Sequence, residues 1–400
     1  LLKRDKRDIM ADILIRDGRV ITDEGIWDGG SVHIRGDKIA NVAKGMLHVP
    51  GAKVIEAAGR YVSPGFIDIH VHGGDGAAFS DATLDAFEKI TRFYARYGVT
   101  ALQATPSALP LEGMREVLEA YREWRRQPGG GGSAILGVHL EGPYFSMEQK
   151  GAQPPQYIRN PGAEDFALLL DNTDIITEVT LAPEIPGALE LTRQLAARGV
   201  VVAAGHSSAK EYEILPAIEA GLSHVAHIYS SMSTVIREGP WRVPGLLEVG
   251  LTHPALTGEM IADGKHLPPT LMRLIVRCRG TDRLCMVSDA MRAAGGPEGV
   301  KFASEGAEII IEDGVAIMAD RTCFAGSITP LGRMVRNVIQ LIDMPLLEAV
   351  KMAARVPAQV LRIANRKGRL APGLDADVVI FDDDINIWLT MVGGEIVYAA

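Results

Sequence analysis

The sequence predicts an α/β protein: a (β/α)8 barrel with a small β-sandwich domain formed from both termini. Three observations support this prediction: eight short apolar runs in the middle of the chain, amphipathic segments between them, and strand-like runs at both ends. The chain of 400 residues is long enough for one large and one small domain. We place the small domain at residues 10–62 plus 366–400, and the barrel at residues 63–365.

The two ends of the chain share a strand-like pattern. Between Asp12 and Val62, short alternating apolar runs are broken by turns such as Asp17-Gly18, and residues 377–381, 385–389 and 396–398 repeat this style. Such runs predict a small antiparallel β unit assembled from both ends. Residues 1–9 are charged and lack the apolar core of a secretory signal, so we expect a disordered extension there.

The middle of the chain alternates short, nearly continuous apolar runs with longer helical patterns. This alternation is typical of parallel strands covered by helices on both faces, and eight such units in about 230 residues match the size of a barrel. The predicted strands are residues 65–72, 100–105, 135–141, 176–181, 200–206, 224–229, 256–262 and 283–289. The predicted helices include residues 84–97, 111–126, 187–198, 209–220 and 267–279.

A doubly wound sheet is the alternative fold. The glycines of Gly73-Gly74-Asp75-Gly76 follow the first run, as a dinucleotide-binding loop would. Their spacing does not match GxGxxG, however, and the chain has no GK[ST] motif of a phosphate-binding loop. The barrel is therefore the better interpretation.

Composition narrows the possible partners. The net charge of −9 argues against a nucleic-acid ligand, and no stretch is apolar enough for a membrane helix, so we expect a small-molecule substrate. The three cysteines, Cys278, Cys285 and Cys323, are widely spaced and form no CxxC pair. This pattern fits a reducing cytoplasm rather than a disulfide framework or a thiolate zinc site.

Polar side chains gather at the carboxyl ends of the apolar runs. In a barrel these ends form one face, which is where active sites of this fold are built. A single histidine at a strand end is more often structural, but so many imidazoles and carboxylates on one face favour a metal site. They are His70, His72, Glu141, His206, His227, Asp263, His266 and Asp289.

The types of these residues indicate the chemistry. Imidazole and carboxylate ligands without thiolate suit zinc, with iron, manganese or cobalt as alternatives. A bound divalent ion activates water and polarises a carbonyl, as hydrolysis of an amide requires. Asp289 is the candidate acid–base residue, and its alternative role is a helix N-cap before Ala290.

Several segments resemble the amidohydrolase superfamily and, within it, the N-acetylglucosamine-6-phosphate deacetylases. The resemblance runs over nearly the whole chain, and its most specific parts are the HLEGP segment with the later GHS and SDA segments. The matching stretches include residues 64–73, 139–144, 150–152, 205–207, 262–266, 287–290, 325–327 and 372–377.

This resemblance implies that Glu141, His206 and His227 bind the principal ion, while His70 and His72 can hold a second one. By analogy, His266 contacts a sugar hydroxyl. Arg237 reaches a substrate phosphate, in the neighbouring subunit's site if the sites are shared, which implies a homodimer.

The chain departs from the family pattern near the expected substrate. Gln153 replaces a usual histidine, and Ser230 and Ser231 replace an asparagine and an alanine. With Gly326, we assign these residues to substrate binding. The expected reaction is removal of the acetyl group from an N-acetylated hexosamine, with N-acetylglucosamine 6-phosphate as the first candidate. Neutral groups bind phosphate less strongly than charged ones, so the unphosphorylated sugar is the second candidate. Hydrolysis of another amide or amidine, and a non-catalytic scaffold, are the alternatives.

Overall fold

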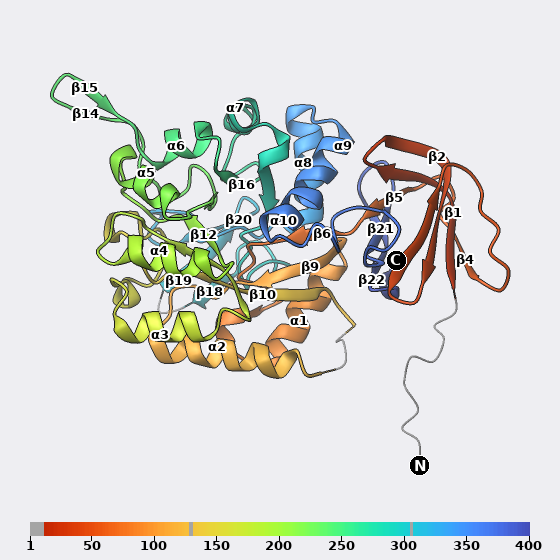
Figure 1. Ribbon diagram of the computed structural model, residues 1–400, viewed down its shortest axis with the longest axis horizontal. Coiled ribbons are helices and arrows are strands. Elements are labelled where there is room, and N and C mark those ends of the chain that lie inside the picture. The colour runs from red at the N-terminus through yellow and green to blue at the C-terminus, as the bar shows by residue number, and fades with distance from the viewer. Residues whose placement is uncertain (1–11, 128–130, 305–306) are drawn as a thin grey trace, which may run out of the picture.

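The computed structural model describes residues 12–127, 131–304 and 307–400, which form a helix-covered barrel with a β domain at one side (Figure 1). The extension predicted at residues 1–9 lies outside the described residues. Within those residues, every helix is too short or too polar to span a lipid bilayer.

Eight parallel strands form the barrel and follow one another in chain order. The eight predicted runs correspond to these strands one by one. The barrel closes where Val71 and Ala290 form a parallel bridge and the Asp289 N–H donates to the His70 carbonyl at 2.9 Å. The strands are β6 (Phe66–Asp68), β9 (Val99–Ala104), β10 (Ala134–Glu141), β11 (Ile176–Leu181), β12 (Val201–Ala204), β13 (His224–Val225), β16 (Thr257–Ile261) and β17 (Leu284–Val287).

Helices surround the barrel, as the amphipathic pattern predicts. In the first, Phe87, Ile90 and Tyr94 are buried at helical spacing, and the Thr83 hydroxyl caps the start by accepting from the Ala86 N–H at 3.2 Å. The five predicted helices correspond to α1 (Leu84–Ala95), α2 (Leu111–Trp124), α4 (Ala188–Ala197), α5 (Glu211–Glu219) and α7 (Pro269–Arg279). The helices not predicted are α3 (Ala163–Asp171), α6 (Leu246–Thr252), α8 (Leu331–Ile342), α9 (Leu346–Ala353) and α10 (Arg355–Val360).

Strands from both ends of the chain pair in one sheet, with its own apolar core around residues such as Ile15, Val32 and Ile380. Val62 pairs antiparallel with Ile380, which joins the two ends. The sheet is mixed rather than antiparallel, because β1 runs parallel to β4 and β5. The exact domain limits stay a prediction. The strands are β1 (Ile13–Thr22), β2 (Gly25–Arg35), β3 (Lys38–Ala43), β4 (Lys53–Glu56), β5 (Tyr61–Pro64), β21 (Val378–Phe381), β22 (Ile387–Val392) and β23 (Glu395–Ala399).

Among the described residues, three small sheets belong neither to the barrel nor to the β domain, and they were not predicted. Gly73-Gly74 (β7) pairs with Ala77-Ala78 (β8) directly after the first barrel strand. A hairpin of β14 (Ile236–Glu238) and β15 (Trp241–Val243) projects far from the barrel (Figure 1). A sheet of β18 (Lys301–Ser304), β19 (Ala307–Glu312) and β20 (Val315–Met318) follows the eighth barrel strand.

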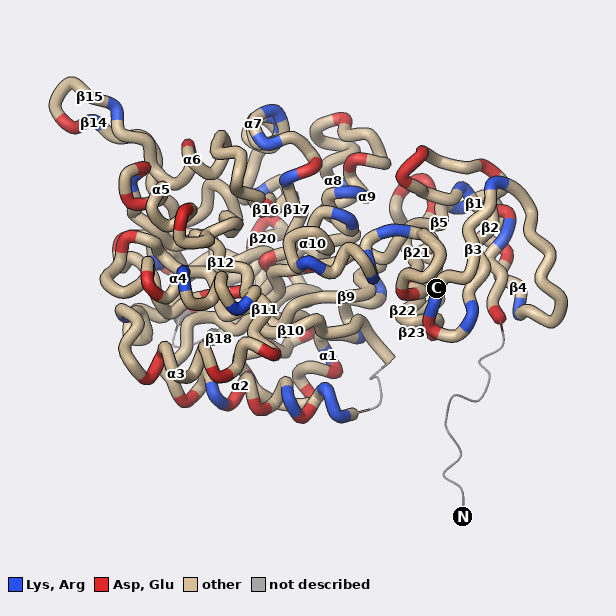
Figure 2. Tube along the Cα trace, in the orientation of Figure 1, with Lys and Arg blue, Asp and Glu red and all other residues tan. Residues whose placement is uncertain are grey.

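Charges of both signs are interspersed over the outer helices (Figure 2). On α1, Lys89 pairs with Asp85 and Arg92 pairs with Glu88, each one turn apart. Such a surface is typical of solvated helices.

Candidate active site

The predicted site residues meet at the carboxyl end of the barrel. Glu141 is the last residue of β10, His206 and His227 follow β12 and β13 by two residues, and Asp289 follows β17 by two. They line a cavity of about 360 Å³, together with His72. The sequence places these side chains on one face because every parallel strand ends there.

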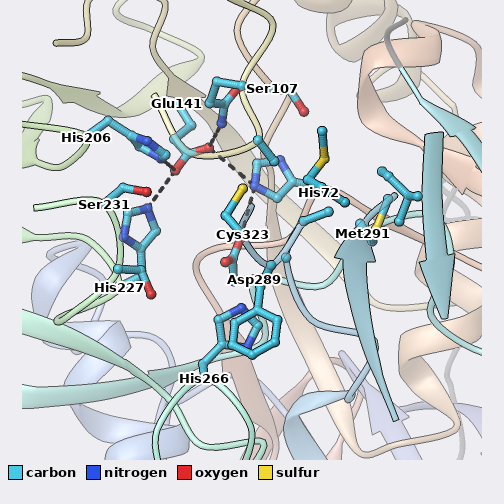
Figure 3. A pocket seen from close by; sticks show the side chains of 18 of the residues that line it. His72, Ser107, Glu141, His206, His227, Ser231, His266, Asp289, Met291 and Cys323 are labelled. Carbon is cyan, nitrogen blue, oxygen red and sulfur yellow. Dashed lines mark hydrogen bonds and ion pairs between the residues drawn. The ribbon is translucent and has the colours of Figure 1, made fainter. Parts of the chain in front are cut away.

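Glu141 lies at the centre of the cluster, between His206, His227 and His72 (Figure 3). Its Oε1 is 3.1 Å from His206 Nε2, 2.9 Å from His227 Nε2 and 3.4 Å from His70 Nε2. Its Oε2 is 3.4 Å from His72 Nε2. Burial alone would raise the pKa of Glu141, but the charges of His70 and His206 and the hydrogen bonds from His206 and His227 hold it well below its usual range.

Three of the four imidazoles are oriented through Nδ1. His72 Nδ1 lies 3.0 Å from the Thr105 carbonyl oxygen, His206 Nδ1 lies 2.9 Å from that of Gln149, and His70 Nδ1 lies 2.9 Å from Glu259 Oε2. Because these partners only accept, Nδ1 carries a proton, so Nε2 is the nitrogen that would offer a lone pair to a bound ion.

This donor set fits a divalent ion. His70 Nε2 and His227 Nδ1 are buried without a hydrogen-bond partner. Ligand atoms of His70, Glu141 and His227 lie within 4.8 Å of one another, as do those of His70, His72 and Asp289. Nitrogen and oxygen donors at such spacing can hold one or two borderline cations.

Asp289 lies beside the imidazoles and faces the cavity. Its Oδ1 is 3.1 Å from His72 Nε2 and 3.7 Å from His70 Nε2. Burial alone would raise the pKa of Asp289, but the His72 hydrogen bond and the charges of His70 and His72 hold it below its ordinary value. The residue has a φ of 44°, and no helix begins after it, so the alternative role as a helix N-cap is wrong.

Most residues assigned to substrate binding also line the cavity: His266, Ser230, Ser231, Gln153 and Gly326. His266 Nδ1 lies 2.6 Å from Asp263 Oδ2, so its Nε2 is free to meet a ligand. Gly326 has a φ of 93°, and a Cβ there would lie 2.9 Å from the Asp289 carbonyl oxygen. Glycine is thus required beside Asp289.

Gln153, which was expected to contact substrate, lies against the proposed metal ligand Glu141. Its Nε2 donates to Glu141 Oε2 at 2.5 Å, and its Oε1 accepts from the Ala108 N–H at 2.8 Å. Both groups of the amide are therefore engaged by the protein, and Gln153 contacts a proposed metal ligand directly.

Arg237 does not reach the cavity of its own chain. It lies on β14, in the projecting hairpin, where its guanidinium donates only to the Gly239 carbonyl at 3.4 Å among the described contacts. Its surroundings include the exposed side chains of Val235, Ile236 and Trp241, the last 74% exposed.

Other residues around the site were not predicted from the sequence. Met318, Cys323 and Phe324 enter the cavity wall from the segment that carries β20 and its following loop, for which the barrel pattern holds no signal. Glu259 was also missed, although a carboxylate within the apolar run 256–262 could have identified it.

Comparisons with known proteins match this site and fold. The amidohydrolase family model matches residues 61–397. The chain is 37% identical to the N-acetylglucosamine-6-phosphate deacetylase of Vibrio furnissii over 338 residues, 84% of this chain and 83% of the relative. It is 34% identical to the N-acetylgalactosamine-6-phosphate deacetylase of Escherichia coli O157:H7, over 96% of this chain and 98% of the relative.

The fold is also similar to that of a solved structure. A mutant N-acetyl-D-glucosamine-6-phosphate deacetylase of Mycobacterium smegmatis, in complex with N-acetyl-D-glucosamine-6-phosphate, aligns with a TM-score of 0.88 and 30% identity, covering 97% of this chain and 100% of that one. The chain therefore belongs to the amidohydrolase family of hydrolases, whose membership implies a divalent metal. Within it, the chain belongs with the N-acetylglucosamine-6-phosphate deacetylases.

Proposed function

We propose that this enzyme hydrolyses the N-acetyl amide of an N-acetylated hexosamine 6-phosphate, giving the free amine and acetate. The observation that carries the proposal is the convergence of four imidazoles on Glu141, beside Asp289, in a cavity of about 360 Å³. The names of the relatives support the amino-sugar substrate.

For the metal centre, we propose that Glu141, His206 and His227 hold the principal ion. His70, His72 and Asp289 lie close enough together to hold a second. Zinc suits these ligands best, with iron, manganese or cobalt as alternatives. A bound ion would lower the pKa of a water molecule and polarise the amide carbonyl.

Asp289 is the proposed acid–base residue. Its low pKa keeps the carboxylate ionised at neutral pH, so it can accept a proton from the attacking water. The proton then passes to the nitrogen of the leaving amine as the carbon–nitrogen bond breaks. Asp289 Oδ1 lies 3.1 Å from His72 Nε2, so the carboxylate is held at the edge of the cluster, where the attacking water would be.

The remaining cavity residues suit a sugar. His266, held by Asp263, can bond a hydroxyl, and the hydroxyls of Ser230 and Ser231 can bond hydroxyl or phosphate oxygens. Gln153 supports Glu141, and Gly326 leaves space beside Asp289. The three cysteines are unpaired, which fits the cytoplasm as the proposed location.

Acetate release is the direct test of this function. We expect metal-dependent acetate release from N-acetylglucosamine 6-phosphate or N-acetylgalactosamine 6-phosphate, lost on chelation and restored by zinc, and slower release from the unphosphorylated sugars. Ammonia release, or no turnover of any N-acetylated amino sugar by the metal-loaded enzyme, would contradict the proposal.

We further propose a homodimer in which the hairpin of one subunit completes the site of its partner. Arg237 is remote from its own cavity, and the exposed Ile236 and Trp241 beside it are typical of a contact surface. A guanidinium delivered from outside would provide the phosphate contact that neutral Ser230 and Ser231 provide only weakly.

Replacing Arg237 by alanine is expected to raise KM for the phosphorylated substrate about tenfold to a hundredfold, because a charge-assisted hydrogen bond is lost. KM for the unphosphorylated sugar should change little. Steady-state kinetics check this, with R193A as a control because Arg193 is an exposed arginine on α4 that pairs with Glu190.

Mixing subunits tests the shared site. A dimer of one R237A subunit and one D289N subunit retains one site with both an intact Asp289 and an intact Arg237. Co-expressed subunits should therefore be more active than either parent variant. Activity no higher than that of the parents, or a monomer by light scattering, would contradict the shared site.

A further inference from the structure

A buried carboxylate that is not itself a proposed ligand lies behind the cluster of proposed metal ligands. Glu259, in the middle of β16, is 0% exposed. Its Oε2 accepts from His70 Nδ1 at 2.9 Å and from the backbone N–H of His227, also at 2.9 Å. One oxygen therefore contacts two residues that belong to different proposed ion sites.

The bond to Glu259 determines which nitrogen of His70 is available. With Nδ1–H donating to the carboxylate, Nε2 keeps its lone pair. That Nε2 lies 3.4 Å from Glu141 Oε1 and 3.7 Å from Asp289 Oδ1, fully buried and without a hydrogen-bond partner. His70 is thus held with a free donor atom at the point where a second ion would bind.

Charge distinguishes His70 from the other oriented ligands. The Nδ1 atoms of His72 and His206 face neutral backbone carbonyls, whereas that of His70 faces a carboxylate. Two divalent ions would bring four positive charges into this buried site, and Glu141 and Asp289 supply only two negative ones. A third carboxylate behind His70 offsets part of the excess and makes the imidazole a stronger ligand.

We infer that Glu259 is a positioning residue, which holds His70 and thereby determines whether the second ion binds. The inference rests on the two-ion arrangement of the proposed function. The proposed ligands of the principal ion, Glu141, His206 and His227, have no side-chain bond to this carboxylate among the described contacts, and His227 contacts it only through its backbone N–H, so the main effect should fall on the second ion.

The substitution Glu259→Gln removes the negative charge of Glu259 and leaves the size of the side chain nearly unchanged. The amide oxygen can accept the same two hydrogen bonds, and the amide nitrogen would face His224 Nε2, which lies 3.4 Å from Glu259 Oε1. The control is Glu178→Gln: Glu178 is a fully buried glutamate on β11 whose carboxyl group lies within 4.8 Å of Glu259 and His224 but makes no hydrogen bond or ion pair to a proposed ligand among the described residues.

The readout is the number of bound ions and their dissociation constants, measured by elemental analysis and chelator competition. The wild type and E178Q should hold two zinc ions. E259Q should hold the second ion about 10- to 100-fold more weakly, with the principal ion unchanged. Retention of the principal ion also shows that the variant is folded.

A double variant tests whether Glu259 acts through His70. Because H70Q already removes the second ion, adding E259Q should change the ion count no further. If E259Q does not fold, Glu259→Asp keeps the charge but withdraws it from His70 Nδ1 and from the His227 N–H. It should weaken the second ion more than the principal ion, because His227 loses only a backbone hydrogen bond.

Several results would overturn the inference. The first is that E259Q holds two ions with wild-type affinity, and the second is that it loses both ions. The third is that E178Q loses an ion, and the fourth is that the wild type binds only one ion at saturating zinc. A wild type that releases no acetate would instead contradict the proposed function and leave these ion counts unaffected.

Discussion

Replacing Asp289 by asparagine is expected to lower kcat for acetate release by about 10²- to 10⁴-fold, because an amide cannot accept a proton from water or return it to the amine. Asparagine is nearly isosteric and can still bond His72, so the cluster should keep its geometry. The proposed ligands of the principal ion lie at the end of β10 and two residues after β12 and β13, so this ion should remain bound. Steady-state kinetics and metal analysis of the same preparation check both parts.

The matched control lies at the other end of the same strand. Asp282, just before β17, pairs with Lys351 far from the cavity, so D282N should leave kcat unchanged. Full activity of D289N would contradict the assigned role. Loss of the principal ion from D289N would instead make Asp289 chiefly a metal ligand.

Replacing Glu141 by glutamine is expected to have a different signature, because activity and the principal ion should be lost together. Glu141 Oε1 contacts three of the imidazoles, and it is the carboxylate at the centre of the cluster. A neutral amide is a weak ligand, and without this carboxylate less of the ion's charge is offset in the buried site. Metal content per chain and acetate release, measured at rising zinc concentration, provide the check.

The response to zinc distinguishes a defect in metal binding from a defect in proton transfer. High zinc should restore part of the activity of E141Q by mass action, whereas it should not help D289N. E178Q, which replaces a buried glutamate on the neighbouring strand whose pKa is raised well above its ordinary value by burial, should bind zinc normally. An E141Q enzyme with its full principal ion would show that another ligand set holds that ion.

Both the family resemblance and the cluster of proposed metal ligands could be predicted from the sequence, because each proposed ligand lies in a short, recognisable segment. His70, Glu141 and Asp289 stand at or beside the carboxyl ends of apolar runs, where a buried strand rarely tolerates charge. Parallel strands carry such residues to one face whatever the loops do. Five of the ten helices were predicted for a related reason, since a long amphipathic period is readable without knowledge of its partner.

Other features depend on contacts between distant segments, which no local pattern records. Gln153 was expected at the substrate, and it does line the cavity, but its bond to Glu141 was not predicted because it joins the loop after β10 to the end of that strand. Arg237 was placed at a phosphate, in the neighbouring subunit's site if the sites are shared, and only the structure shows that it lies on a projecting hairpin. Met318 and Phe324 reach the cavity only because an additional sheet follows the eighth strand.

By itself, the sequence determined the barrel, the joining of the two ends in one β domain, and the candidate ligands, since each follows from periodicity within a short segment. Only the tertiary structure decided how the ligands are oriented and supported. Glu259, Thr105 and Gln149 orient three imidazoles from other segments, because a hydrogen bond depends on distance in space and not on separation along the chain.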